Sequence, residues 1–189
     1  RNVLAVIPGT EYPEESIALT AHYDSVPVGK GAHDNASGAA ALMHIYRHFL
    51  KNPPKRTLRF IWCGAEEGGL FGSQAYIKRN KALLPQIRLC FNFDMCGTTL
   101  GENHISVTGG EALKHFTEQF CREVGRSSVV RVRVQSSDSA VFADHGVPAI
   151  AISRYADSAD YHVHSDVLFP LGAEQLYRDA EFAVRCAQR

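Results

Sequence analysis

Four segments of this chain place histidine or acidic side chains directly after a run of apolar, strand-forming residues. The first segment, Thr20 to Gly38, carries His22, Asp24 and Asp34 in a Gly/Pro-rich loop that follows the apolar residues 17–19. An imidazole and carboxylates at such a position are ligands that a divalent cation such as zinc binds. One such loop is weak evidence, so the interpretation depends on its repetition.

The other three segments repeat the arrangement. Glu66 and Glu67 follow the apolar run 57–63, and Asp94 lies at the end of a near-continuous apolar run, 88–95. The polar loop after Pro148 to Ser153 carries the last group: Asp157, Asp160, Tyr161, His162, His164 and Asp166. The repetition makes a metal site the leading interpretation.

The elements that must position these residues alternate between strand and helix patterns. Apolar or β-branched runs predict strands, helical spacing predicts helices, and Gly/Pro pairs end several of them. This order predicts an α/β fold, a three-layer sandwich whose mixed, mostly parallel central sheet is flanked by helices. The expected strands cover residues 3–7, 17–23, 57–63, 88–95, 105–108, 129–134 and 148–153, and the expected helices 35–50, 70–80, 111–124, 139–145 and 172–187.

In a parallel sheet the ligand crevice lies outside the carboxyl ends of the strands. The histidine and acidic residues all follow such ends, so we expect them to meet at one edge and to hold two metal ions. Asp34 is expected to bridge the ions, with His22 and Asp94 on one ion and Glu67 and His162 on the other.

Glu66 remains as the general base. Neighbouring residues that leave a strand point in different directions, so Glu66 faces the water between the ions while Glu67 binds metal. Asp24 and Asp166 are expected to accept the free ring N–H of His22 and His162. We therefore place Asp24 beside Glu66 in the catalytic set and Asp166 in a supporting position.

These motifs resemble a known family. The segments AHYDS, GAHDNASG, AEEGGLFGS, NFDMCG and YHVHSD are similar, in order and over nearly the whole chain, to the di-zinc aminopeptidases that include bacterial leucyl aminopeptidases and the catalytic domain of glutamate carboxypeptidase. The resemblance assigns the same metal residues, with Glu66 as base. It implies a phosphorylase/hydrolase-like fold, residues 1–189 as one metallopeptidase catalytic domain, and two zinc ions or other divalent ions as cofactors.

The activity implied by the resemblance is release of N-terminal amino acids from peptides by attack of a metal-bridging water. The last motif departs from the usual His-Thr-x-x-Asp, because Val163 replaces the threonine while the spacing from His162 to Asp166 is kept. His164 is a rival ligand, but that spacing favours His162. Arg154, Tyr155 and Tyr161 are candidates for substrate binding, although an ion pair or simple packing explains them equally well.

Two alternatives remain open. A glutaminyl cyclase-like acyltransferase shares part of these motifs but uses one zinc ion, and the full two-metal ligand set disfavours it. A non-catalytic, receptor-like domain would show loss of ligands, and none of the six key residues is lost.

Composition limits the partners. The 189 residues include 20 basic and 20 acidic side chains without a basic block, so we expect a peptide or small amino-acyl substrate, no nucleic acid and no membrane span. The five cysteines, an odd number, favour free thiols and a reducing, cytoplasmic location. Because the chain starts at Arg1, a secreted or periplasmic location applies if an N-terminal segment was removed. Nothing in the sequence indicates an oligomeric state.

Overall fold

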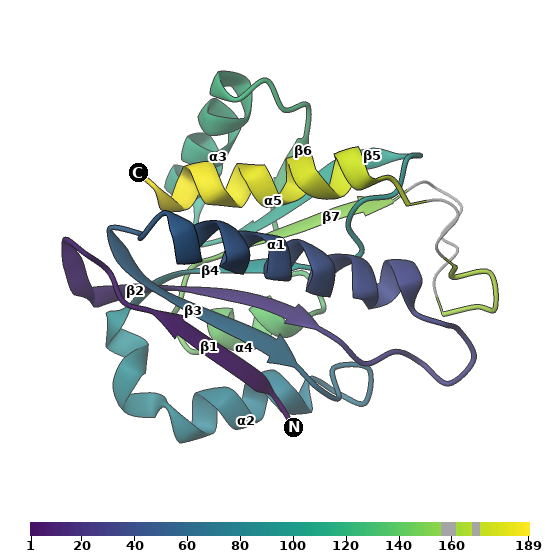
Figure 1. The fold of residues 1–189 in the computed structure, drawn as a ribbon, viewed down its shortest axis with the longest axis horizontal. Coiled ribbons are helices and arrows are strands. Elements are labelled where there is room, and N and C mark those ends of the chain that lie inside the picture. Colours follow the sequence, from purple (N-terminus) through teal and green to yellow (C-terminus); the bar gives the residue numbers. More distant parts are fainter. Residues whose placement is uncertain (156–161, 168–170) are drawn as a thin grey trace.

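A seven-stranded sheet runs through the centre of the computed structural model, which describes residues 1–155, 162–167 and 171–189 (Figure 1). The strand order is β1-β3-β2-β4-β7-β5-β6, and the central strands β3, β2, β4 and β7 are parallel. Only the β1–β3 and β5–β7 pairs among the described strands are antiparallel. The strands are β1 (Val3–Ile7), β2 (Tyr12–His22), β3 (Arg56–Cys63), β4 (Ile87–Phe93), β5 (Glu102–Thr108), β6 (Val129–Val132) and β7 (Ala149–Tyr155).

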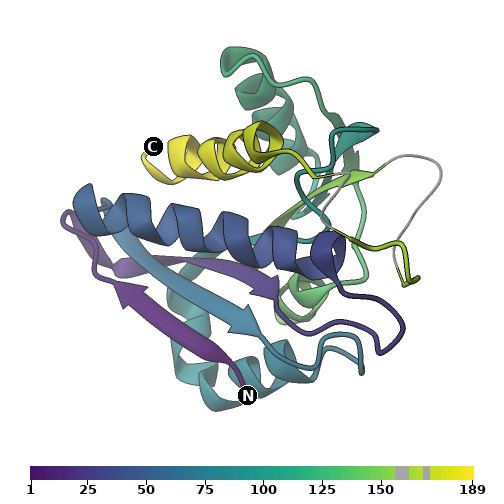
Figure 2. The same cartoon turned by 45° about the vertical axis from the view of Figure 1, so that its right-hand side comes forward.

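Helices cover both faces of the sheet, as the three-layer prediction requires. α1, α3 and α5 contribute to a core on one face, and α2 and α4 to a smaller core on the other. Figure 2 shows α1 and α5 lying side by side over the sheet. The helices are α1 (Gly38–Lys51), α2 (Phe71–Arg79), α3 (Glu111–Glu123), α4 (Asp138–Asp144) and α5 (Ala173–Ala187).

Alternation along the central strands builds these two cores. In β2, Ile17, Leu19 and Ala21 pack into the α1 side, while Ala18 packs into the α2 side. Successive side chains of a strand point to opposite faces, so strands covered on both faces read as continuous apolar runs. This pattern explains why the run 88–95, which contains β4, has so few polar residues.

The parallel strands bring their carboxyl ends to one edge of the sheet, where the arrows of β2 and β3 end in Figure 2. His22 is the last residue of β2 and Asp94 directly follows β4, so this edge carries the predicted cluster. The prediction of an α/β sandwich is therefore confirmed.

Several local differences separate the structure from the sequence prediction, among them the following. β2 starts at Tyr12 rather than at residue 17, with a bulge between Tyr12 and Ser16, and residues Lys81–Gln86 form a 3-10 helix that was not predicted. α1 starts at Gly38 rather than at Asn35, because the preceding turn contains non-helical backbone at Asp34 and Asn35.

Two further expectations concern the environment of the chain. All five cysteines are free thiols, and four of them are buried. Among the described residues, no helix is both long enough and apolar enough to cross a bilayer.

Candidate metal centre

Asp34 lies between two histidines, and each of its carboxylate oxygens faces one of them. Oδ1 is 3.0 Å from His22 Nε2, and Oδ2 is 3.2 Å from His162 Nε2. Two histidines on opposite oxygens of one carboxylate form the arrangement expected of a residue shared by two adjacent cation positions. The structure thus brings His22 and His162, which lie near opposite ends of the sequence, to the same carboxylate.

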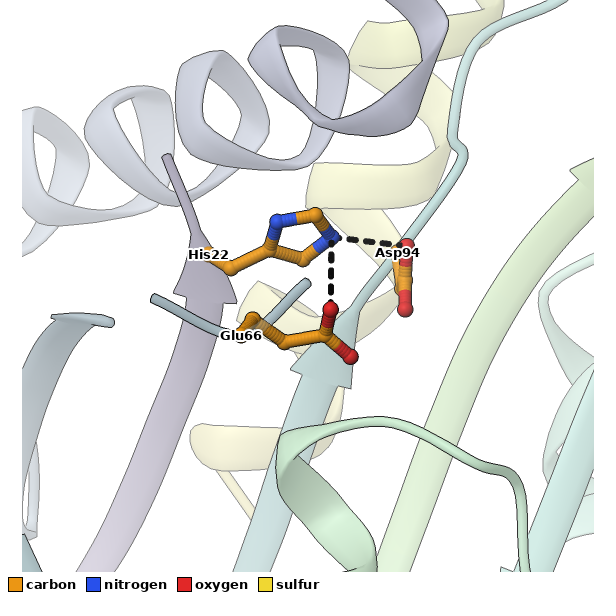
Figure 3. A group of neighbouring side chains, drawn as sticks. All are labelled: His22, Glu66 and Asp94. Carbon is orange, nitrogen blue, oxygen red and sulfur yellow. Dashed lines mark hydrogen bonds and ion pairs between the residues drawn. The ribbon is translucent and has the colours of Figure 1, made fainter. Parts of the chain in front are cut away.

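The first position groups His22, Asp94 and Glu66 (Figure 3). His22 Nε2 is 3.4 Å from Asp94 Oδ1 and 4.0 Å from Glu66 Oε2. The ring of His22 is almost fully buried, with 2% of its side chain exposed, so it cannot turn toward solvent. Glu66 belongs to the loop after β3, and only its carboxylate reaches this group.

The second position groups His162, Glu67 and Asp34. His162 Nε2 is 2.9 Å from Glu67 Oε2, and 47% of the His162 side chain is exposed. His164 is exposed as well, but the contacts to Asp34 and Glu67 come from His162. This second position is therefore the one closer to solvent.

Backbone conformation helps to aim these side chains. Ala65, Met95 and His162 have φ values of 58°, 57° and 60°, in the left-handed region that few non-glycine residues occupy. Ala65 precedes Glu66, Met95 follows Asp94, and His162 is itself in the cluster. Such conformations cost about 1–3 kcal/mol each and persist where the surrounding contacts hold them, typically at functional sites.

Asp24 has a different contact from the one expected. The Nδ1 atom of His22 lies 3.1 Å from the backbone carbonyl of Asp24 and 3.7 Å from its carboxylate. The carboxylate instead accepts the backbone N–H groups of Glu66 and Glu67, at 3.0 and 3.2 Å. Asp24 therefore orients His22 through its main chain and holds the Glu66-Glu67 turn through its side chain.

Asp166 also differs from the expectation that it accepts the His162 ring N–H. Its buried carboxylate accepts the backbone N–H of His33 at 2.6 Å and that of Asp34 at 3.1 Å. The side chain thus fixes the backbone that carries Asp34. No sequence signal pointed to these partners, because the spacing of a motif does not reveal which atoms a carboxylate meets.

Replacing Asp166 by asparagine is expected to weaken metal binding without abolishing it. One amide oxygen replaces two charged acceptors, so the Asp34 backbone is held less firmly, and we expect an affinity loss of about 10- to 100-fold. Chelator competition measures the change, with the exposed Glu11→Gln as control. Unchanged affinity in Asp166→Asn would contradict this role.

Asn35 joins two of the loops and was missed as a site residue in the sequence. Its side-chain oxygen accepts the backbone N–H groups of Gly38 and Met95, and its amide donates to the Phe93 carbonyl at 2.9 Å. Asn35 therefore ties the segment of Asp34 to that of Asp94. The asparagine directly after Asp34 was the available signal in the sequence.

Asp138 is a buried acid that begins α4. It is fully buried, and neither carboxylate oxygen has a hydrogen-bond partner among the described residues. Burial raises the pKa of Asp138 to about 6, although Ser73 and His22 act to lower it.

We expect Asp138→Asn to stabilise the metal-free protein at neutral pH. The folded state keeps the proton of Asp138 to about pH 6, whereas the ordinary pKa is 3.8, so the stability contributed by the protonated form is lost as pH rises through that window. The difference corresponds to about 3 kcal/mol at most. Urea unfolding should show a gain at about pH 8 that shrinks at about pH 4; an equal change at both values would contradict the assignment.

The cluster concentrates negative charge in a buried space. Burial raises the pKa of Glu66 to about 8, although the neighbouring His22 acts to lower it. Burial and the adjacent Asp34 raise the pKa of Glu67. Burial alone would lower the pKa of His22, but hydrogen bonds to Asp34 and Asp94 raise it to about 12. The carboxylates therefore require compensating positive charge.

The types of ligand atom in this cluster suit a divalent metal ion. Imidazole nitrogen with carboxylate oxygen is a zinc ligand set, and Glu67 Oε1 is buried without a hydrogen-bond partner in the described part of the chain. A buried, unpaired carboxylate oxygen is costly unless a cation or a proton meets it. Two groups of possible ligands share His22: one adds Glu66 and Asp94, and the other adds Asp34 and Glu67. Within each group, the ligand atoms lie within 4.8 Å of one another.

Of the three residues predicted to bind substrate, the structure describes the side chain of Arg154 alone. The guanidinium of Arg154 points away from the cluster, donating to the Thr98 carbonyl at 2.6 Å and to Asn103 Oδ1 at 2.9 Å. Its backbone carbonyl lies 3.0 Å from the ring nitrogen Nε2 of His33. The expected clamp on a substrate carboxylate is thus wrong for this side chain. Tyr161 and the side chain of Tyr155 lie outside the described part of the structure.

Residues 2–183 of this chain match the model of "Peptidase family M28". Aminopeptidase YwaD of Bacillus subtilis is 32% identical over 137 residues, which cover 69% of this chain and 30% of that protein. A probable leucine aminopeptidase of Arthroderma otae is 28% identical over 203 residues, covering 95% of this chain and 54% of that protein.

Solved structures agree. A zinc aminopeptidase from Bacillus subtilis superposes with a TM-score of 0.85 at 26% identity, over 97% of this chain and 48% of that one. An aminopeptidase from Aneurinibacillus sp. strain AM-1 gives a TM-score of 0.88 at 26% identity, over all of this chain and 48% of that one. The chain therefore spans about half the length of these two structures. It spans 30% of the length of aminopeptidase YwaD.

Proposed function

Because the chain belongs to peptidase family M28, we propose that it is the catalytic domain of a zinc-dependent aminopeptidase that releases N-terminal amino acids from peptides. The observation that carries the proposal is Asp34, whose two carboxylate oxygens lie 3.0 and 3.2 Å from the two histidines. The names of the relatives, several of them aminopeptidases and one a zinc enzyme, support the same activity.

The ligand set we propose is divided between two zinc ions. His22 and Asp94 would hold one ion, Glu67 and His162 would hold the other, and Asp34 would be shared between them. When bound, the zinc ions supply Lewis acidity, which polarises the scissile carbonyl and lowers the pKa of water. Other divalent cations with similar ligand preferences are alternatives for the same residues.

Glu66 carries the proton transfers. Its carboxylate removes a proton from the attacking water, whose oxygen forms the new bond to the scissile carbonyl carbon. As the C–N bond breaks, Glu66 returns that proton to the leaving amine, so that the carboxylate is regenerated. Asp24 holds the backbone N–H groups of Glu66 and Glu67, and thereby keeps base and ligand in their relative positions.

A panel of aminoacyl-anilides tests the proposal. The zinc-loaded protein is expected to hydrolyse substrates that have a free amino group and to leave their N-acetylated counterparts intact, since an exopeptidase recognises the terminus. Metal analysis of the same sample should give about two zinc ions per chain. Hydrolysis of neither series would overturn the proposed activity.

The same sample separates the two alternative functions. Pyroglutamate formation from peptides with N-terminal glutamine, together with about one zinc ion per chain, would identify a glutaminyl cyclase-like acyltransferase. Metal binding without turnover of any substrate would instead indicate a receptor-like domain.

A further inference from the structure

A cavity of about 480 Å³ lies between α5 and the segment that follows α3. Four arginines line it, Arg126, Arg154, Arg178 and Arg185, whereas Glu181 is its one acidic lining residue among those described. The chain as a whole is balanced, with 20 basic and 20 acidic residues, so this concentration of positive charge is local. None of the metal-centre residues lines the cavity.

Buried contacts hold the inner wall of the cavity in place. Arg126 pairs with Asp179 at 2.5 Å, and both side chains are nearly inaccessible, at 7% and 1% exposure. The guanidinium of Arg126 also lies over the ring of Phe182, 5.3 Å from its centroid. The inner wall therefore holds a fixed guanidinium that packs on the buried ring of Phe182.

The outer wall is formed by one face of α5. Arg178 and Arg185 lie two helical turns apart on this face and pair along the helix with Glu174 at 2.6 Å and Glu181 at 2.7 Å. More than half of each arginine side chain is exposed. Exposed pairs of this kind contribute little to stability, so a stronger acceptor can replace the glutamates.

From this arrangement we propose that the cavity binds a phosphate-bearing small molecule. The planar guanidinium offers paired N–H donors that match phosphate oxygens, and a doubly charged anion can engage Arg178 and Arg185 together. The volume lies in the range of small-molecule pockets, roughly 300–1,000 Å³, and Val124 in the lining provides apolar surface for the rest of the ligand. This site is independent of the proposed peptidase activity.

Titration of inorganic phosphate into the zinc-loaded protein, followed by calorimetry, tests the proposal. The double variant Arg178→Gln/Arg185→Gln is expected to bind phosphate at least about tenfold more weakly than the parent, because both exposed guanidinium groups are lost. These two side chains are exposed and outside the core, so the variant should fold, which its circular dichroism spectrum checks. Glu181→Gln should tighten phosphate binding, since it removes the negative charge in the cavity.

A matched control removes two positive charges elsewhere. Arg47→Gln/Lys51→Gln changes two exposed residues of α1 that do not line the cavity, and should bind phosphate as the parent does. Phosphate held only by the zinc ions would be unaffected by the double arginine variant, and that result would overturn the proposal, as would absence of binding to the parent. Acetate binding as tight as phosphate binding would overturn the assignment of a phosphate group.

Discussion

Glu66→Gln is expected to keep both metal ions and to lose turnover. Glutamine has nearly the same shape, but its amide cannot accept the proton of the attacking water, and general-base catalysis contributes about 10²- to 10⁴-fold. We therefore expect kcat on a hydrolysed aminoacyl-anilide to fall by about that factor while KM changes little. The measurement is steady-state kinetics beside metal analysis of the same preparation.

The base assignment has a clear contrary result. Glu66 belongs to one of the two groups of possible metal ligands, with its Oε2 atom 4.0 Å from His22 Nε2. Loss of a metal ion in Glu66→Gln would therefore make it a ligand rather than the base. Activity equal to that of the parent would exclude both roles.

Glu67→Gln, the same chemical change at the next residue, is expected to lose one metal ion. The Glu67 carboxylate lies 2.9 Å from His162 Nε2 in the more exposed half of the centre. Removing its charge takes away a direct ligand, so the affinity for that ion should fall by more than the 10- to 100-fold typical of supporting residues. Zinc titration with a chelating dye measures the loss.

The two neighbouring variants control each other. Both replace a glutamate by glutamine in the same turn, and Asp24 accepts the backbone N–H of both residues. Any general disturbance of this turn would affect the two variants alike. If Glu67→Gln retains two tightly bound ions, the division of ligands between the two positions is wrong.

Much of the fold could be predicted because the strands are covered on both faces. Continuous apolar runs such as 88–95 predict central strands, and parallel strands bring their ends to one edge. The positions of His22 and Asp94 at strand ends follow directly. The sequence did not predict the turn Ala32–Ser37, because non-helical backbone at Asp34 leaves no trace in the spacing of apolar residues.

The contacts between side chains were the least predictable part of the site. Asp24 and Asp166 were expected to accept the ring N–H groups of His22 and His162. Both carboxylates instead accept backbone N–H groups. Any buried carboxylate near such a centre can accept from a ring or from the main chain, and only coordinates distinguish the two. Asp138 was missed for a related reason: its burial depends on how α4 packs, not on the residues next to it.

The link from Asp166 to the backbone of His33 and Asp34 has a consequence for biosynthesis. A nascent chain that has left the ribosome only as far as Asp94 already contains His22, Asp34 and Glu67, but lacks both His162 and the carboxylate that secures the shared aspartate. The centre is therefore completed only after residues 162–166 have emerged, and a divalent metal should bind tightly only from that point on.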